Sequence, residues 1–166
     1  MTNAKILQLT NSAIGAVAAN ANLPLGVVTT IYPFDVNSCF PTYTITSSTS
    51  DTLSINKPGT YRVIYSISAV ATAAGELVIT LNVNGVAKYA VSVTAAAGET
   101  VNLTLPYEIF IPCNCATAPI NVPAAIQFEN AGVAITSGTA NLIVSKEVWL
   151  LLLNNRGVAR VLSRSL

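Results

Sequence analysis

Apolar and polar residues alternate with a period of two through the middle of the chain. Every second residue is large and apolar in two runs, Leu77 to Val83 and Tyr89 to Val93, and Asn84-Gly85 lies between them. Such alternation is typical of strands with one buried face. Asn-Gly suits a type I′ turn, whose two central residues need positive φ. The pattern therefore predicts a β-hairpin over residues 76–93.

The same reasoning predicts further strands on both sides of this hairpin. Tyr61, Val63, Tyr65 and Ile67 share one face of a strand that follows Pro58-Gly59, and Val101 to Leu105 alternate after Ala97-Gly98. Weaker strands are expected at 26–32, 43–46, 53–55, 107–111, 124–128 and 139–145. Eight to ten short strands with regular turns favour an all-β, two-sheet antiparallel sandwich or jelly roll in a single domain.

One strand also carries a resemblance to a known family. The segment Gly59-Thr60-Tyr61-Arg62-Val63-Ile64-Tyr65-Ser66 resembles the central strand of the tumour-necrosis-factor-like jelly roll found in complement globular heads. The residues Val83-Asn84-Gly85, 98–103 and 140–144 also fit this family. In the general character of its sequence, the chain is similar to head domains of bacterial spore-surface proteins and to phage modules. The likeness covers roughly Leu23 to Lys146, although no Gly-x-y collagen stalk precedes that range.

The resemblance implies a jelly roll of about ten strands that assembles as a tight homotrimer and has a structural or binding role without catalysis. We accordingly expect an N-terminal arm over 1–22 and the jelly-roll domain over 23–146. A C-terminal extension over 147–166 is expected to pack on the domain or on a neighbour.

Composition narrows the choice of partners. Hydrophobic residues make up 52% of the chain and charged residues only 9%, with a net charge of +1. A chain with so little charge has no strong field for attracting nucleic acid, and its apolar surplus suggests that copies or partners cover part of the surface. The longest apolar run, Val148 to Leu153, is far shorter than the roughly 20 residues of a spanning helix. We expect no membrane span, no nucleic-acid binding and no signal peptide.

Residues suited to catalysis are sparse. The chain has no histidine, and its seven carboxylates are scattered, mostly near turns and strand ends. Cys39, Cys113 and Cys115 are an odd set without further ligands, so the sequence supports neither a disulfide framework nor a zinc site. We expect no enzyme activity, no metal and no cofactor. A carboxylate pair brought together by folding, as in a lyase or glycosidase, is the alternative left open.

The aromatic residues have two interpretations. Tyr61, Tyr65, Tyr107, Phe110 and Phe128 either fill the core of the sandwich or lie on a trimer axis, where large rigid side chains fill the space between subunits. Alternation cannot separate these two roles, because both faces of an inner sheet would be buried in a trimer.

The C-terminal segment is the candidate docking tail. Trp149 directly precedes a run of four leucines, and Arg156, Arg160 and Arg164 follow at a spacing of four residues. On a helix the three arginines would lie on one face. The first interpretation is a last strand, an Asn-rich turn and a frayed basic tail. The second is a peptide that docks on a neighbouring subunit or a larger particle.

Two functions follow from these observations. The first is a structural protein of a phage particle, such as a capsid fibre, decoration or tail-associated protein, located on the virion. The second is a bacterial cell- or spore-surface adhesion module that binds a glycan or protein receptor. The sequence alone does not separate them.

Overall fold

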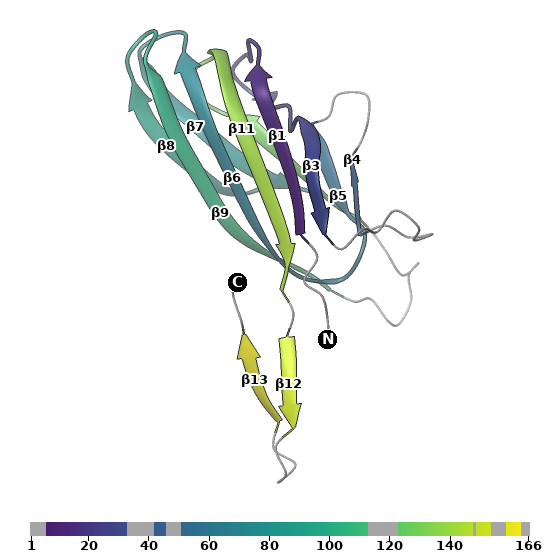
Figure 1. Ribbon diagram of the computed structural model, residues 1–166. Helices are drawn as coiled ribbons and strands as arrows, with labels where there is room; N and C mark the ends of the chain where they lie inside the picture. Colours follow the sequence, from purple (N-terminus) through teal and green to yellow (C-terminus); the bar gives the residue numbers. More distant parts are fainter. Residues whose placement is uncertain are drawn as a thin grey trace.

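The computed structural model is a sandwich of two antiparallel sheets, and it describes residues 6–32, 42–45, 51–112, 123–147, 149–153 and 159–163. No helix occurs among these residues. The five-stranded sheet has the order β3-β1-β11-β6-β9, and it faces the viewer in Figure 1. Its strands are β3 (Val27–Tyr32), β1 (Ile6–Ile14), β11 (Ile135–Lys146), β6 (Gly59–Ala71) and β9 (Thr100–Ile111).

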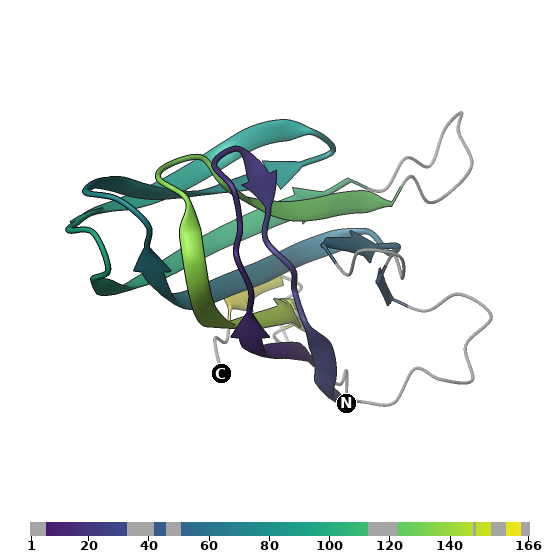
Figure 2. The same cartoon turned by 90° about the horizontal axis from the view of Figure 1, so that it is seen from above.

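The second sheet lies behind the first, and Figure 2 shows the two layers from above. Its order is β4-β5-β10-β7-β8, with β2 also paired to β10. The strands are β4 (Tyr43–Ile45), β5 (Thr52–Ile55), β10 (Ala124–Asn130), β7 (Gly75–Val83), β8 (Val86–Ala95) and β2 (Ala21–Asn22). The predicted all-β jelly-roll sandwich is confirmed.

The core lies between the sheets and is built by the alternation seen in the sequence. In β6 the odd-numbered residues from Tyr61 to Ala71 are buried, and β7 buries Leu77, Ile79 and Leu81. The turn between β7 and β8 has Asn84 at φ 52° and Gly85 at φ 75°. Both central residues of this turn have positive φ, as the predicted type I′ hairpin requires.

Two features of the five-stranded sheet differ from the expectation. β1 was not predicted, yet it pairs with both β11 and β3 inside the sheet. It falls within residues 1–22, which we expected to precede the jelly roll as an arm. The strands expected at 101–105 and 107–111 are one continuous strand, β9, with Pro106 opposite Ile64. Proline is tolerated there because β9 is an edge strand and the missing N–H belongs to its unpaired side.

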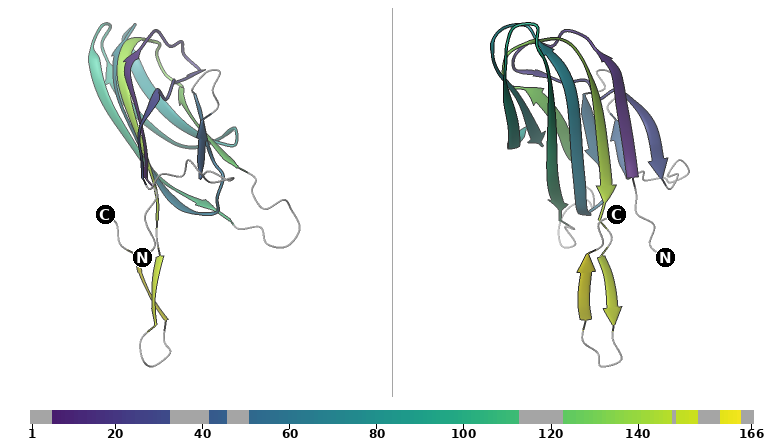
Figure 3. Two further views of the ribbon diagram at one scale, coloured as in Figure 1. Left: turned by 45° about the vertical axis from the view of Figure 1, so that its right-hand side comes forward. Right: turned by 60° about the vertical axis from the view of Figure 1, so that its left-hand side comes forward.

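A third region continues past the sandwich. β12 (Trp149–Leu153) and β13 (Ala159–Ser163) form a separate antiparallel pair. This hairpin extends beyond one end of the sandwich in both views of Figure 3.

Candidate interaction surface

Three of the five candidate aromatics belong to the core of a single subunit. Tyr61, Tyr65 and Phe128 are at most 1% exposed. The Tyr65 and Phe128 rings stack with centroids 4.0 Å apart, and Tyr61 meets Tyr43 edge-on at 6.1 Å. The Tyr61 hydroxyl donates a hydrogen bond to the Lys57 carbonyl oxygen at 2.8 Å. Side chains so enclosed by their own subunit cannot also reach a neighbour.

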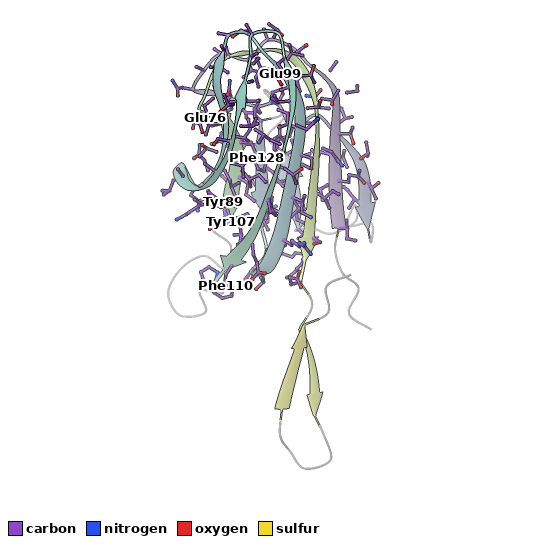
Figure 4. All side chains as sticks on the ribbon, turned by 90° about the vertical axis from the view of Figure 1, so that its left-hand side faces the viewer. Glu76, Tyr89, Glu99, Tyr107, Phe110 and Phe128 are labelled. Carbon is purple, nitrogen blue, oxygen red and sulfur yellow. The ribbon has the colours of Figure 1, made fainter. Side chains whose placement is uncertain are left out.

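The other two candidates lie on β9, at an edge of the sandwich. Tyr107 is half-buried and stacks on Tyr89 of β8, with ring centroids 5.9 Å apart. Phe110 is 72% exposed. Figure 4 shows these three rings along the edge where β8 and β9 meet, well apart from Phe128 in the interior. Tyr89, which the sequence analysis did not single out, completes this aromatic edge. Phe110 is therefore the candidate aromatic whose ring is largely available to another molecule.

The outward surface of the five-stranded sheet, here called the five-stranded face, is nearly free of charge at its centre. The strand register aligns outward-facing residues of neighbouring strands in three rows. The central row is polar. A mainly apolar row adjoins it on one side, and a second row of hydroxyl and amide side chains adjoins it on the other. The rows, from β1 or β11 towards β9, are Gln8, Ile143, Ile64 and Pro106; Thr10, Asn141, Ser66 and Thr104; and Thr139, Ser68 and Asn102.

Hydrogen bonds within and between these rows satisfy several of the polar groups. Gln8 Nε2 donates to Asn141 Oδ1 at 3.3 Å, and the Ser66 and Thr104 hydroxyls lie 3.2 Å apart. The first charged residues below the apolar row are Arg62 and Glu108, which lie opposite each other on β6 and β9. The middle of the face therefore presents uncharged side chains, which cost less free energy to remove from water than charged groups do, provided that their polar atoms find hydrogen-bond partners.

An open hollow of about 560 Å³ lies on this face. Ser66, Ser68, Asn102, Thr104 and Asn141 contribute to its lining, together with residues of β1. Most of the lining residues carry a hydroxyl or amide group, but carbon atoms make up most of the lining surface. The hydroxyl and amide groups can bond to a polar ligand or to the polar backbone and side chains of a second subunit.

The outward surface of the other sheet has a different chemistry. Asn82 Nδ2 donates to Glu129 Oε2 at 2.8 Å on neighbouring strands β7 and β10. At the β5 side, Gln127 donates to the Thr52 hydroxyl, which in turn donates to Asp51 at 2.9 Å. Charged groups held in this way are costly to remove from water. The two outer surfaces thus differ in how readily a partner could cover them.

The structure also places part of the docking tail. Trp149 begins β12, and Arg160 lies in β13. Arg160 lies in a strand that pairs antiparallel with β12, so the one-face arrangement considered for a helix does not apply to it. Arg156 and Arg164 lie outside the described residues, as do Cys39, Cys113 and Cys115.

The acidic residues of the described ranges do not form a metal site. No cluster of three or more histidine, cysteine or acidic residues that could hold a metal ion occurs there. The Glu99 carboxylate accepts a hydrogen bond from the Ala96 backbone N–H at 2.7 Å and so caps a turn. Over the same residues, no helix is long and apolar enough to cross a membrane.

Comparisons of sequence find no match, whereas comparisons of structure do. No family model and no curated protein matches the chain. The globular domain of zebrafish complement 1qA protein is similar, with a TM-score of 0.56 and 7% identity over 84% of this chain and 94% of that one. PRD1 vertex protein P5 has a TM-score of 0.51 and 15% identity over 87% and 96%. Eiger TNF from S. frugiperda has a TM-score of 0.51 and 11% identity over 84% and 90%.

At such low identity the likeness is one of fold. The matches cover 84–87% of this chain and 90–96% of the other chains. The chain therefore has the tumour-necrosis-factor-like jelly-roll fold that its sequence predicts.

Proposed function

We propose that the protein is a non-enzymatic structural module that forms a homotrimer through its five-stranded face and belongs to a phage particle. The observation that carries the proposal is the contrast between the two outer surfaces. The centre of the five-stranded face is uncharged, whereas the opposite surface carries carboxylates such as Glu129 and Glu76. Interface cores are depleted in charged residues, so the five-stranded face is the better candidate for contact between subunits.

The exposed apolar side chains of this sheet support the same assignment. Phe110 on β9 is 72% exposed and Val27 on β3 is 70% exposed, and the two lie on opposite edge strands of the sheet. Around a three-fold axis, contacts are heterologous, so one edge of a subunit meets a different part of its neighbour. Large apolar residues at both edges suit such a ring.

The particle assignment is supported by one of the similar structures. PRD1 vertex protein P5, a vertex protein by its name, shares the fold along most of both chains. A fold hosts many functions, so the gene neighbourhood is the direct test of this part of the proposal. Adjacent capsid and tail genes are expected, and sporulation or secretion genes there would contradict the particle role.

The second candidate function is an adhesion module that binds a glycan or protein receptor. The hollow on the five-stranded face favours it, because hydroxyl and amide groups such as those of Ser66 and Asn141 suit the hydroxyls of a sugar. A binding hollow must stay open to solvent, whereas a trimer interface covers it. Binding of the intact chain to a glycan array, lost in Asn141→Ala, would favour this candidate.

A matched pair of substitutions tests the interface. Ser66 lies at the centre of the five-stranded face, and Ser92 lies on β8 of the other sheet, opposite Val78. Ser66→Lys places a charge in each copy of the interface, and a buried unpaired charge costs several kcal/mol. Light scattering is expected to show a monomer for Ser66→Lys and a trimer for Ser92→Lys. Equal masses for the two variants would overturn the proposed interface.

A further inference from the structure

The turn between β7 and β8 holds the one Asn-Gly pair in the sequence, Asn84-Gly85. An asparagine before glycine is prone to lose its side-chain amide, because glycine has no side chain to shield the backbone nitrogen that attacks it. Both residues are exposed, and nothing lies within 4 Å of a Cβ built on Gly85. Steric crowding therefore does not protect this amide.

Two hydrogen bonds tie Asn84 to a single residue of β10, Ala125. The Asn84 backbone N–H donates to the Ala125 carbonyl oxygen at 2.8 Å, and the Ala125 N–H donates to the Asn84 side-chain Oδ1 at 2.8 Å. In a regular antiparallel pair a backbone carbonyl oxygen accepts the second of these bonds. Asn84 has a left-handed backbone, with φ 52°, and its side-chain oxygen takes that place. The amide is thus held by the sheet.

The folded turn opposes the loss of this amide. The reaction requires the Gly85 nitrogen to bond to the Asn84 Cγ, which closes a five-membered ring. A type I′ turn sets ψ of its first central residue at about +30°. At that angle the next nitrogen lies nearly opposite Cβ about the Cα–C bond, and the bond from Ala125 holds Oδ1 towards β10. The ring can close only after the turn opens.

We propose that Asn84 is a deamidation site that the folded hairpin protects and that opening of the turn exposes. In the open turn the Gly85 nitrogen bonds to the Asn84 Cγ, and the bond from Cγ to Nδ2 breaks. Nδ2 leaves as ammonia with the proton that the Gly85 nitrogen loses. Water then opens one of the two bonds between the ring nitrogen and the imide carbonyl carbons. One opening gives aspartate, and the other gives isoaspartate.

The two products differ in how they fit the hairpin. Aspartate keeps the length of the backbone and an oxygen that can accept the Ala125 N–H. Isoaspartate lengthens the backbone by a methylene group, which the two-residue turn that pairs Val83 with Val86 cannot accommodate. A chain that forms isoaspartate while unfolded therefore loses the register of β7 with β8. The site marks chains that have spent time unfolded.

The intact chain tests the proposal without any substitution. Samples are kept in mildly alkaline buffer, either folded or unfolded in guanidinium chloride, and peptide mapping by mass spectrometry follows the replacement of NH2 by OH. We expect Asn84 to react many-fold faster in the unfolded chain. Asn102 is the internal reference, because it is exposed on β9 but precedes the branched Leu103. It is expected to react far more slowly than Asn84 in the unfolded chain.

Each comparison has an outcome that contradicts the proposal. Equal rates for Asn84 in the folded and unfolded chains would overturn the protection by the hairpin. Equal rates for Asn84 and Asn102 in the unfolded chain would overturn the site itself. Neither comparison depends on the proposed trimer.

Ala125→Pro tests whether the bond from β10 contributes to the protection. Proline removes the N–H that donates to Oδ1, and circular dichroism checks that the variant folds. We expect Asn84 in the folded variant to react several-fold faster than in the folded intact chain, with Asn102 unchanged. An unchanged rate at Asn84 would show that this bond does not protect the amide.

A second pair of variants tests the same bond without proline. Asn84→Asp and Asn84→Gly both tolerate positive φ, but only aspartate keeps an acceptor for the Ala125 N–H. The melting temperature is expected to fall in Asn84→Gly and to stay near that of the intact chain in Asn84→Asp. Equal melting temperatures for the two variants would contradict the role of Oδ1.

Refolding tests the consequence for the hairpin. Chains aged in the unfolded state are returned to native buffer, and size-exclusion chromatography separates folded from misfolded protein. Isoaspartate at position 84 is expected to be several-fold enriched in the misfolded fraction. The same isoaspartate content in both fractions would contradict its exclusion from the turn.

Discussion

Two tyrosines of β6 point into the same core but differ in what their hydroxyl groups contact. Tyr61 donates to the Lys57 carbonyl oxygen, whereas the Tyr65 hydroxyl has no hydrogen-bond partner among the described residues. A buried polar group without a partner costs free energy, and a satisfied one contributes about 1 kcal/mol. The two positions therefore differ in what loss of the hydroxyl should do.

Tyr61→Phe and Tyr65→Phe form a matched pair of stability variants. We expect Tyr61→Phe to lower the free energy of unfolding by about 1 kcal/mol, because the Lys57 oxygen loses its donor. Tyr65→Phe is expected to leave that free energy unchanged or to raise it, because only an unpaired hydroxyl is removed. Urea unfolding at one protein concentration measures both. A larger loss in Tyr65→Phe than in Tyr61→Phe would contradict the hydrogen-bond assignment.

The same burial predicts how stability depends on alkaline pH. Burial raises the pKa of Tyr61 to about 12 and raises the pKa of Tyr65 as well. In the unfolded chain both ionise near pH 10. Above roughly that pH the unfolded state binds fewer protons than the folded state, so the free energy of unfolding must fall as pH rises.

Thermal melts at roughly pH 9 and pH 11 test this dependence. The intact chain is expected to lose stability between the two values, and Tyr65→Phe is expected to lose less, because one group that ionises only on unfolding is gone. The same decline in both proteins would show that Tyr65 does not contribute to it.

At the scale of elements, a close crossing fixes the turn after β10. The Ala131 and Val133 N–H groups donate to the carbonyl oxygens of Val78 and Glu76 on β7. A Cβ added at Gly132 would lie 2.2 Å from the Glu76 carbonyl oxygen. The turn can therefore lie against β7 only with glycine at this position.

Gly132→Ala tests the crossing, with Gly15→Ala as the control. Gly15 has nothing within 4 Å of an added Cβ. We expect Gly132→Ala to destabilise the protein by about 1–3 kcal/mol through overpacking, and Gly15→Ala to be nearly neutral. Differential scanning calorimetry checks both, and equal melting temperatures for the two variants would argue against the tight contact.

How far the sequence predicts these elements depends on whether the signal is local. The β7–β8 hairpin is predictable because Asn84-Gly85 specifies its turn and register. β1 was missed although Leu7 and Leu9 alternate with Gln8 and Thr10, because only these two apolar residues alternate and no Gly or Pro turn precedes them. The sequence analysis divided β9 into two strands, 101–105 and 107–111, because only the sheet order shows that β9 is an edge strand in which Pro106 is tolerated.

The candidate site was less predictable than the fold. Alternation predicts that one face of β6 is buried and the other is not, but it does not tell which aromatic residues belong to the core. Tyr61 and Tyr65 proved to be buried, and Phe110 proved to be exposed. The uncharged rows of the five-stranded face combine residues from four strands, so their alignment appears only once the register of β1, β11, β6 and β9 is known.

At the scale of the whole molecule, the low charge of the chain is unevenly distributed. Only 9% of residues are charged, and the central rows of the five-stranded face hold none of them. The β12–β13 hairpin follows β11, the central strand of the same sheet. A surface poor in charge and flanked by exposed apolar residues is typical of an interaction site. The proposed self-association through this face accounts for both the composition and the charge distribution of the surface.

Light scattering of the intact chain during dilution tests this account most directly. The account predicts three times the mass of one chain at high concentration, with dissociation to single chains only on strong dilution. A single-chain mass that persists at high concentration, with the protein folded, would contradict it.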